Sequence, residues 1–299
     1  MAAGSRVIPS MTNMDTIELA DERARVVVNP RQGAAILRYD ALRSDGVVTP
    51  VIKPSEGLLK FGSQLLAPWS NRISGGGFEF DKRFHAIEPN VEGEPFPLHG
   101  DAFQKPWRLK RRTGTEAEFV LGDGSIGPYR YYASVLYGLE NGALSATLTI
   151  ENRAEIRLPY GLGFHPWFPR KAHTSLQASA KSVWLEDERH LPTRMVPLTD
   201  HLDWDFSRRA PLPDTWVNNA FEGWDGRASI VQPDDAIVVS IEASPPLGVF
   251  ILYSPARDAG FFCFEPVSHT VDAHHIGGLR TLEPRESMTS RTRLRWHEL

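Results

Sequence analysis

The sequence has little cysteine, no long hydrophobic run and no excess of positive charge. Cys263 is the only cysteine, which excludes an intrachain disulfide and a metal held by a cluster of thiolates. No stretch approaches the roughly 20 apolar residues of a membrane-spanning helix, and the N-terminal residues 1–21 contain no apolar core of a signal peptide. The net charge of −4 provides no basic surface for nucleic acid. We therefore expect a cytoplasmic protein that binds neither membrane nor nucleic acid.

Turn residues and alternating strands dominate what is present. The 299 residues include 24 glycines and 23 prolines, which favours many short strands over a few long helices. Apolar and polar residues alternate most clearly over 131–151, where Asn141-Gly142 predicts a hairpin turn. Further strands are expected at 17–20, 24–28, 35–39, 78–80, 107–110, 117–121, 183–185, 237–241, 250–253 and 291–296. The predicted fold is all-β, a large antiparallel β-sandwich formed as a single domain by residues 16–299 after a loose N-terminal lead, residues 1–15.

Four short stretches place polar or ionisable side chains beside glycine, proline or aromatic residues. They are Asn71-Arg72-Ile73 before the glycine run 75–77, Leu98-His99-Gly100, His165-Pro166-Trp167-Phe168, and Glu265-Pro266. Alone, each has a structural explanation as well, such as an arginine that caps a turn or a glutamate at an exposed strand end. Glu265 is the most informative, because a carboxylate in the apolar run 261–267 is costly to bury and would have a raised pKa. Such a carboxylate suits a general base near neutral pH.

The four stretches, in this order and with this spacing, resemble the aldose 1-epimerase (galactose mutarotase-like) family over about residues 20–297. The strand-rich segment 144–152, the approach to His165 through 158–161, and the closing segment 279–287 are similar to the family as well. The resemblance implies a large antiparallel β-sandwich with the sugar in a groove on one concave face. It also implies interconversion of the α and β anomers of a free aldose, with a small sugar as substrate and without cofactor or metal.

The resemblance further implies roles for individual residues. Glu265 would remove the proton from O1 of the sugar, and His165 would protonate the ring oxygen O5. Imidazole suits the second role because its ordinary pKa lies near 6.5. His99 and Arg72 would hold ring hydroxyls or O5 through charge-assisted hydrogen bonds.

Other residues near these motifs complete the expected site. Asn71, Asn218 and Trp167 are the further candidates for sugar binding, whereas Trp69 is expected in the core. Gly161 and Gly163 would leave room for the sugar ring beside His165.

Two departures from the family pattern bear on the substrate. Asn218, in the segment 216–221, stands where the family usually has the aspartate of an Asp-x-x-Phe stretch. Asparagine offers one acceptor oxygen and one donor group in place of two acceptor oxygens. The segment 266–275 also differs from that of galactose-processing members. Both departures leave the preferred sugar open, and the sequence predicts no oligomeric state.

Three alternative functions remain open on the sequence alone. A hexose-6-phosphate 1-epimerase would need basic residues at the pocket rim, for which Arg72, Arg130, Arg170 and Lys171 are candidates. A non-catalytic carbohydrate-binding protein could use the same fold but would need neither acid nor base. A metal enzyme could draw its ligands from the set Glu265, His269, His274 and His275.

Overall fold

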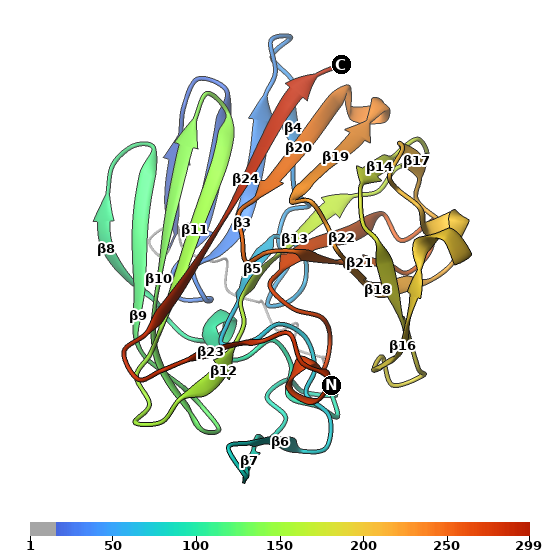
Figure 1. The fold of residues 1–299 in the computed structure, drawn as a ribbon. Helices are drawn as coiled ribbons and strands as arrows, with labels where there is room; N and C mark the ends of the chain where they lie inside the picture. Colours follow the sequence, from blue (N-terminus) through green and yellow to red (C-terminus); the bar gives the residue numbers. More distant parts are fainter. Residues whose placement is uncertain (1–15) are drawn as a thin grey trace, which may run out of the picture.

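Two large antiparallel sheets form the protein, as the computed structural model shows for residues 16–299 (Figure 1). The predicted N-terminal lead, residues 1–15, lies outside the described residues. The larger sheet has 11 strands in the order β1-β2-β3-β5-β13-β22-β21-β18-β15-β16, with β4 paired to β3. The smaller sheet has nine strands in the order β17-β14-β19-β20-β24-β11-β10-β9-β8. Two separate strand pairs, β12–β23 and β6–β7, complete the described sheets.

The bounds of the elements follow the chain. The larger sheet contains β1 (Ile17–Ala20), β2 (Ala24–Asn29), β3 (Ala35–Leu42), β4 (Val48–Pro50), β5 (Ser63–Leu66), β13 (Gly163–Pro169), β15 (Ser182–Glu186), β16 (Pro192–Pro197), β18 (Val217–Glu222), β21 (Val249–Ser254) and β22 (Phe261–Val267). The smaller sheet contains β8 (Arg108–Arg112), β9 (Glu116–Ile126), β10 (Tyr129–Glu140), β11 (Ala143–Asn152), β14 (Ser175–Ala178), β17 (Ala210–Pro211), β19 (Arg227–Gln232), β20 (Ile237–Ala243) and β24 (Ser287–Glu298). The remaining elements are β6 (Gly77–Phe80), β7 (Arg83–Ala86), β12 (Leu158–Tyr160), β23 (Arg280–Leu282), the short helix α1 (Ala273–Ile276) and the 3-10 turns η1 (Ala102–Gln104), η2 (Leu198–Asp200), η3 (Leu202–Trp204) and η4 (Pro233–Asp235).

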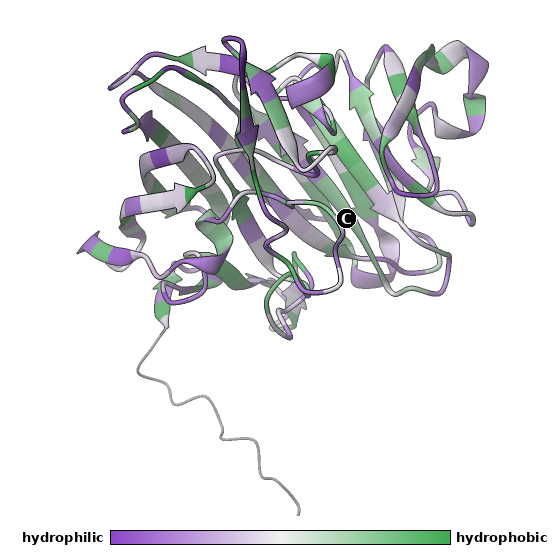
Figure 2. Cartoon of the chain, turned by 90° about the horizontal axis from the view of Figure 1, so that it is seen from below, coloured by the Kyte–Doolittle hydropathy of each residue, from purple (hydrophilic) through white to green (hydrophobic). Residues whose placement is uncertain are grey.

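The prediction of an all-β sandwich is confirmed, and the expected strands lie where the alternation placed them. The hairpin β10–β11 turns at Asn141-Gly142, whose φ angles of 49° and 77° are those that a two-residue hairpin turn needs. Hydrophobic and hydrophilic residues alternate along many strands (Figure 2), so that each strand can bury one face. No helix in the part of the chain that the structure describes is long and apolar enough to cross a membrane.

The two central strands of the larger sheet, β13 and β22, carry apolar side chains on one face and polar side chains on the other. Phe164 and Phe168 of β13, and Phe262 and Phe264 of β22, belong to the main hydrophobic core cluster, together with residues of the smaller sheet. The alternate residues must point to the opposite face, because successive side chains in a strand alternate. That opposite face carries His165 of β13, and it is where the polar site is built.

Candidate active site

His165 and Glu265 face each other across two neighbouring antiparallel strands. Gly163 pairs with Val267 and Trp167 with Cys263, so the register places His165 directly opposite Glu265. Their side chains approach to 3.5 Å between Nε2 and Oε1. His165 is only 6% exposed and Glu265 only 3%. Two residues about 100 positions apart therefore form one buried contact, and Glu265 lies inside a strand and not at an exposed strand end.

Burial opposes charge on both members of this pair. It raises the pKa of Glu265 to about 8, although the positive charge of Arg72 acts against the rise. It lowers the pKa of His165 to about 3, against a smaller effect of a backbone hydrogen bond. At neutral pH these shifts favour a protonated carboxyl and a neutral imidazole. Glu265 Oε2 and His165 Nδ1 are buried without a hydrogen-bond partner in the described chain, and a buried polar atom that is left unpaired is costly to the fold.

Two hydrogen bonds join His99 and Asn71. Both residues have a φ of 62°, a left-handed conformation that is strained for residues other than glycine. The Asn71 N–H donates to His99 Nδ1 over 3.0 Å, and the His99 N–H donates to the Asn71 carbonyl over 3.0 Å. Since Nδ1 accepts, the proton of a neutral ring lies on Nε2. Burial, followed by the nearby His165, holds the pKa of His99 well below its usual range, so the ring offers one neutral N–H donor.

Arg72 is fixed in the pocket wall by a carboxylate that the sequence analysis missed. Its Nη2 donates to Glu94 Oε1 and Oε2 over 3.3 and 3.0 Å, and its backbone N–H donates to Asn71 Oδ1 over 3.0 Å. Only 12% of the Arg72 side chain is exposed. The guanidinium is therefore held in place and largely neutralised by Glu94. No motif marks Glu94, which lies in the loop between β7 and β8.

Aromatic side chains form a row along the pocket, beginning at His165. Trp167 stacks on His165 at 5.1 Å with an interplanar angle of 9°, and its Nε1 donates to Gln64. Tyr253 meets Trp167 edge-on at 6.2 Å and Trp216 at 5.4 Å. Trp216 in turn stacks on His190 at 5.4 Å. These rings give the pocket a flat apolar side of the kind that packs on the C–H faces of sugars.

All seven residues predicted for the site line one pocket of about 380 Å³. They are Asn71, Arg72, His99, His165, Trp167, Asn218 and Glu265. The further lining residues are Leu59, Val91, Glu92, Glu94, Leu98, His190, Trp216 and Tyr253. Among these, Leu98 and Trp216 belong to stretches that the sequence analysis singled out, namely 98–100 and 216–221. Trp69 is fully buried, as expected, and its Nε1 donates a hydrogen bond to the carbonyl of Asn71 over 3.0 Å.

The metal set considered from the sequence does not assemble around Glu265. His269 uses both ring nitrogens on the backbone of neighbouring residues, Ser70 and Thr270. His274 Nε2 contacts the Tyr129 hydroxyl at 2.8 Å, and His275 Nε2 contacts backbone carbonyls. Each of the three imidazoles thus has a structural partner. This alternative was wrong because residues adjacent in sequence here point in different directions.

A different trio, namely His165, Cys263 and Glu265, is the group of described residues that could contact a metal ion. Their potential ligand atoms lie within 4.8 Å of one another. Burial, and then the neighbouring Glu265, raises the pKa of the Cys263 thiol well above its usual range. We assign no metal to this trio.

Comparison with known proteins decides the family to which this fold and pocket belong. The family model of aldose 1-epimerases matches residues 15–295. The chain belongs to the aldose 1-epimerase family. The uncharacterized protein YphB of Escherichia coli K12 is 36% identical over 279 residues, which cover 87% of this chain and 95% of that protein.

Solved structures of aldose 1-epimerase relatives share the fold. An Escherichia coli K12 protein that carries the name aldose 1-epimerase provisionally is 32% identical, with a TM-score of 0.86 over 95% of this chain and 99% of that chain. Galactose 1-epimerase from Lactobacillus acidophilus is 17% identical, with a TM-score of 0.75 over 97% of each chain. At that identity the second likeness concerns the fold alone.

Two glycines of the aldose 1-epimerase motif serve packing and not the sugar. A Cβ at Gly161 would lie 2.1 Å from the His269 ring, and a Cβ at Gly163 would lie 2.7 Å from the Val267 side chain. The expectation that they leave room for the sugar ring was therefore wrong. They let β13 and the segment before it approach the chain around β22 closely enough to align His165 with Glu265.

Replacing Gly161 with alanine should destabilise the fold. The added methyl would displace His269, whose Nε2 accepts the Ser70 N–H next to Asn71. Overpacking of this kind costs about 1–3 kcal/mol, and we expect the melting temperature to fall by about 2–6 °C. Gly122→Ala is the matched control, because a Cβ there meets nothing within 4 Å. Equal melting temperatures for the two variants would contradict this role of Gly161.

Proposed function

We propose that this protein is a mutarotase, which interconverts the α and β anomers of an unphosphorylated aldose by opening and closing the sugar ring. The observation that carries the proposal is the buried contact of 3.5 Å between His165 and Glu265. Each of these groups keeps a buried atom without a partner. A proton donor and a proton acceptor therefore stand together at the wall of a sugar-sized pocket.

The reaction needs one proton on this pair. In our proposal the carboxylate of Glu265 removes the O1 proton while the C1–O5 bond breaks and its electron pair moves to O5. His165 gives its proton to O5, which yields the open-chain aldehyde. Rotation about C1–C2 and the reverse steps close the ring on the other face. The pair regains its starting protonation, so no cofactor or metal takes part.

The pKa shifts of Glu265 and His165 indicate where the proton of this pair lies before the reaction. Burial favours the neutral forms, so the shared proton rests on Glu265. Transfer of that proton to His165 across the 3.5 Å contact gives the charged pair that ring opening requires. Arg72 lowers the pKa of Glu265 and so favours this transfer. Hydroxyl groups of a bound sugar would favour it too, because they solvate charge.

The wall residues fit the binding of neutral hydroxyl groups. His99 offers its Nε2–H, and the aromatic row from Trp167 offers an apolar side. Asn71 and Asn218 add amide groups that line the same pocket. Among the described residues that line the pocket, the one basic side chain is that of Arg72, and it is already bound to Glu94.

The charges at the pocket argue against the alternative of a hexose-6-phosphate epimerase. Glu92 and Glu94 line the pocket beside the paired Arg72. Arg130 instead donates to the carbonyls of Gly127 and Tyr129. A phosphate would thus enter an acidic rim at which, among the described residues, no cation is free to bind it.

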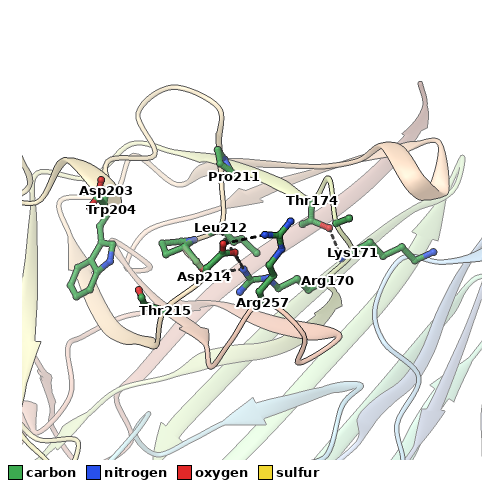
Figure 3. Close-up of a pocket in the computed structure, with 12 residues that line it drawn as sticks. Arg170, Lys171, Thr174, Asp203, Trp204, Pro211, Leu212, Asp214, Thr215 and Arg257 are labelled. Atoms are coloured by element: carbon green, nitrogen blue, oxygen red, sulfur yellow. Dashed lines mark hydrogen bonds and ion pairs between the residues drawn. The ribbon is translucent and has the colours of Figure 1, made fainter.

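The other two basic candidates belong to a separate hollow of about 470 Å³ (Figure 3). There Arg170 donates to Ser254 Oγ and to the Pro213 carbonyl, and Lys171 pairs with Asp235. This hollow shares no lining residue with the pocket of His165. Neither side chain is therefore available to a phosphate on a sugar bound beside Glu265.

A non-catalytic sugar-binding protein would not need the buried pair. A carboxyl that is 3% exposed and has an unpaired oxygen destabilises the fold, and a binding module gains nothing in return. Acid–base chemistry gives this arrangement a function.

Polarimetry on a panel of sugars tests the proposal. Freshly dissolved α-D-glucose, α-D-galactose and glucose 6-phosphate would be followed with and without the protein. We expect faster anomerisation of at least one free aldose, and an effect on the 6-phosphate smaller by about tenfold or more because of its repulsion by the acidic rim. No acceleration over buffer for any free aldose would overturn the enzyme assignment, and faster turnover of the 6-phosphate would favour the phosphate-specific alternative.

A further inference from the structure

One carboxylate just outside the pocket binds three of the residues that line it. Glu186, the last residue of β15, accepts hydrogen bonds from Trp216 Nε1 at 2.8 Å, Asn218 Nδ2 at 2.9 Å and His190 Nδ1 at 3.1 Å. The three donors line the pocket, whereas Glu186 does not. Its side chain is only 16% exposed. Glu186 therefore binds the residues that line the pocket, and we expect no direct contact between Glu186 and the sugar.

This contact fixes the orientation of the Asn218 amide. A carboxylate offers only acceptor atoms, so the NH₂ group of Asn218 must be the end that faces Glu186. The carbonyl oxygen Oδ1 then points away from Glu186, and among the described residues no donor binds it. Asn218 thus presents an acceptor to a sugar hydroxyl. An aspartate at this position would bring a second carboxylate into contact with Glu186, with repulsion between them.

The same carboxylate also holds the aromatic end of the pocket. Trp216 is 43% exposed, and a side chain so exposed can change rotamer unless something restrains it. Its Nε1 is bound to Glu186, its ring stacks on His190 at 5.4 Å, and Tyr253 meets it edge-on at 5.4 Å. A side chain held in its binding position loses less entropy when the ligand arrives.

We propose that Glu186 is a positioning residue that determines which aldoses the pocket binds. It fixes Asn218 as a hydrogen-bond acceptor and Trp216 as an apolar surface. The preferred class is a neutral aldose with a hydroxyl group directed at Asn218 Oδ1 and a C–H face against Trp216. This inference rests on the proposed function, and it deepens that function by assigning the wall that recognises the sugar.

The chain provides a matched control for a simple structural role. Glu222 of β18 accepts the Trp184 Nε1 over 2.8 Å in the same sheet. Neither Glu222 nor Trp184 lines the pocket. Glu222→Gln therefore changes the same kind of carboxylate–indole contact without touching Asn218 or Trp216.

Three variants test the proposal. In Glu186→Gln an NH₂ group replaces one of the two acceptor oxygens, so either Trp216 or the pair Asn218 and His190 loses its acceptor, and the wall is no longer held in place. In Asn218→Asp two carboxylates oppose each other. The double variant Glu186→Gln/Asn218→Asp restores one donor facing one acceptor, with the charge moved to position 218.

The measurement is KM and kcat by polarimetry on D-glucose and D-galactose, with Kd from tryptophan fluorescence. Each single variant should raise KM about tenfold, the effect of losing one good hydrogen bond, with kcat within about twofold. The double variant should return KM to within about threefold of the parent. Glu222→Gln should leave both constants unchanged.

Two results would overturn the inference. One is a KM for Glu186→Gln no higher than that for Glu222→Gln, and the other is a double variant no better than Asn218→Asp alone. Should Glu186→Gln fail to fold, the KM of Asn218→Asp is compared with that of the parent, because this variant leaves Glu186 in place. A KM for Asn218→Asp no higher than the parent's would then overturn the inference. A parent that binds an aldose without accelerating its anomerisation would refute the proposed function only, and Glu186 would then be judged from Kd. A parent that neither binds nor converts any aldose would refute both.

Discussion

Replacing Glu265 with glutamine is expected to lower kcat for anomerisation by about 10²–10⁴-fold, the contribution typical of a positioned acid–base group. Glutamine has nearly the same shape and keeps the hydrogen-bonding atoms beside His165, but it can neither take nor release a proton in this reaction. Sugar binding should therefore survive, with a Kd within about threefold of the parent by tryptophan fluorescence. Polarimetry measures the rate. A variant with more than about a tenth of the parent's rate would remove Glu265 from the chemistry.

The same variant should be more stable than the parent in alkaline solution. The folded chain keeps the Glu265 proton up to about pH 8, whereas the unfolded chain releases it near the ordinary pKa of 4.5. The stabilisation linked to this proton is complete below pH 4.5 and is lost as the pH rises through about 8. Glutamine has no such proton, so the melting temperature of Glu265→Gln relative to the parent should rise between about pH 5 and 9.

A partly buried glutamate in a surface ion pair gives the control for this pH dependence. Lys110 lowers the pKa of Glu118 through a hydrogen bond, and Arg111 adds to the effect. The stabilisation linked to Glu118 is therefore present above its ordinary pKa of 4.5 and is lost as the pH falls through the lowered value. Glu118→Gln should be slightly less stable than the parent at neutral and alkaline pH, and the difference should be small because solvent screens this group. The same sign of change for the two variants would contradict the buried, raised pKa of Glu265.

Replacing His165 with alanine is expected to abolish measurable anomerisation, a loss of about 10²–10⁴-fold in kcat. The variant removes the partner of Glu265 and leaves no group to carry the proton to O5. It also opens a small cavity beneath Trp167, which stacks on the ring at 5.1 Å. Imidazole added to the solution can enter that space, so partial recovery of the rate is the signature of a chemical role. Near-normal activity without added imidazole would show that the catalytic centre lies elsewhere.

A second stacked histidine separates this effect from a general loss of packing. His201 stacks on Trp204 at 5.3 Å, and neither residue lines the pocket of Glu265. His201→Ala should therefore retain the parent's rate, and added imidazole should leave it unchanged. Equal losses of activity in the two variants would contradict a specific role for His165.

The sequence was sufficient for many of the strands and for the seven predicted residues that line the pocket. Alternation and the Asn141-Gly142 turn identified the hairpin of β10 and β11, because the turn and the register of neighbouring strands depend on adjacent residues. The motifs around Arg72, His99 and Glu265 combined polar groups that are costly to bury with glycine, proline or aromatic neighbours. This combination can be recognised from adjacent residues and is typical of functional loops and strand ends. All three of these residues line the pocket.

Nonlocal packing decided what pattern could not. Glu94 and Glu186 have no distinguishing neighbours in the sequence, yet they hold Arg72 and Asn218 from other segments of the chain. Gly161 was assigned to the sugar because its true neighbour, His269, is about 100 residues away. The expected clustering of His269, His274 and His275 around Glu265 failed for a related reason, since each ring is used by the nearest backbone or hydroxyl partner.

The sequence by itself determined the all-β class, many of the strands and the choice of His165 and Glu265 as candidates for an acid–base pair. The tertiary structure decided that β13 lies next to β22 in the register that sets His165 against Glu265. It also decided their protonation, because burial shifts the two pKa values in opposite directions. The physical reason is that strand pairing and desolvation depend on residues distant in the chain, whereas alternation and turn chemistry depend on residues next to each other.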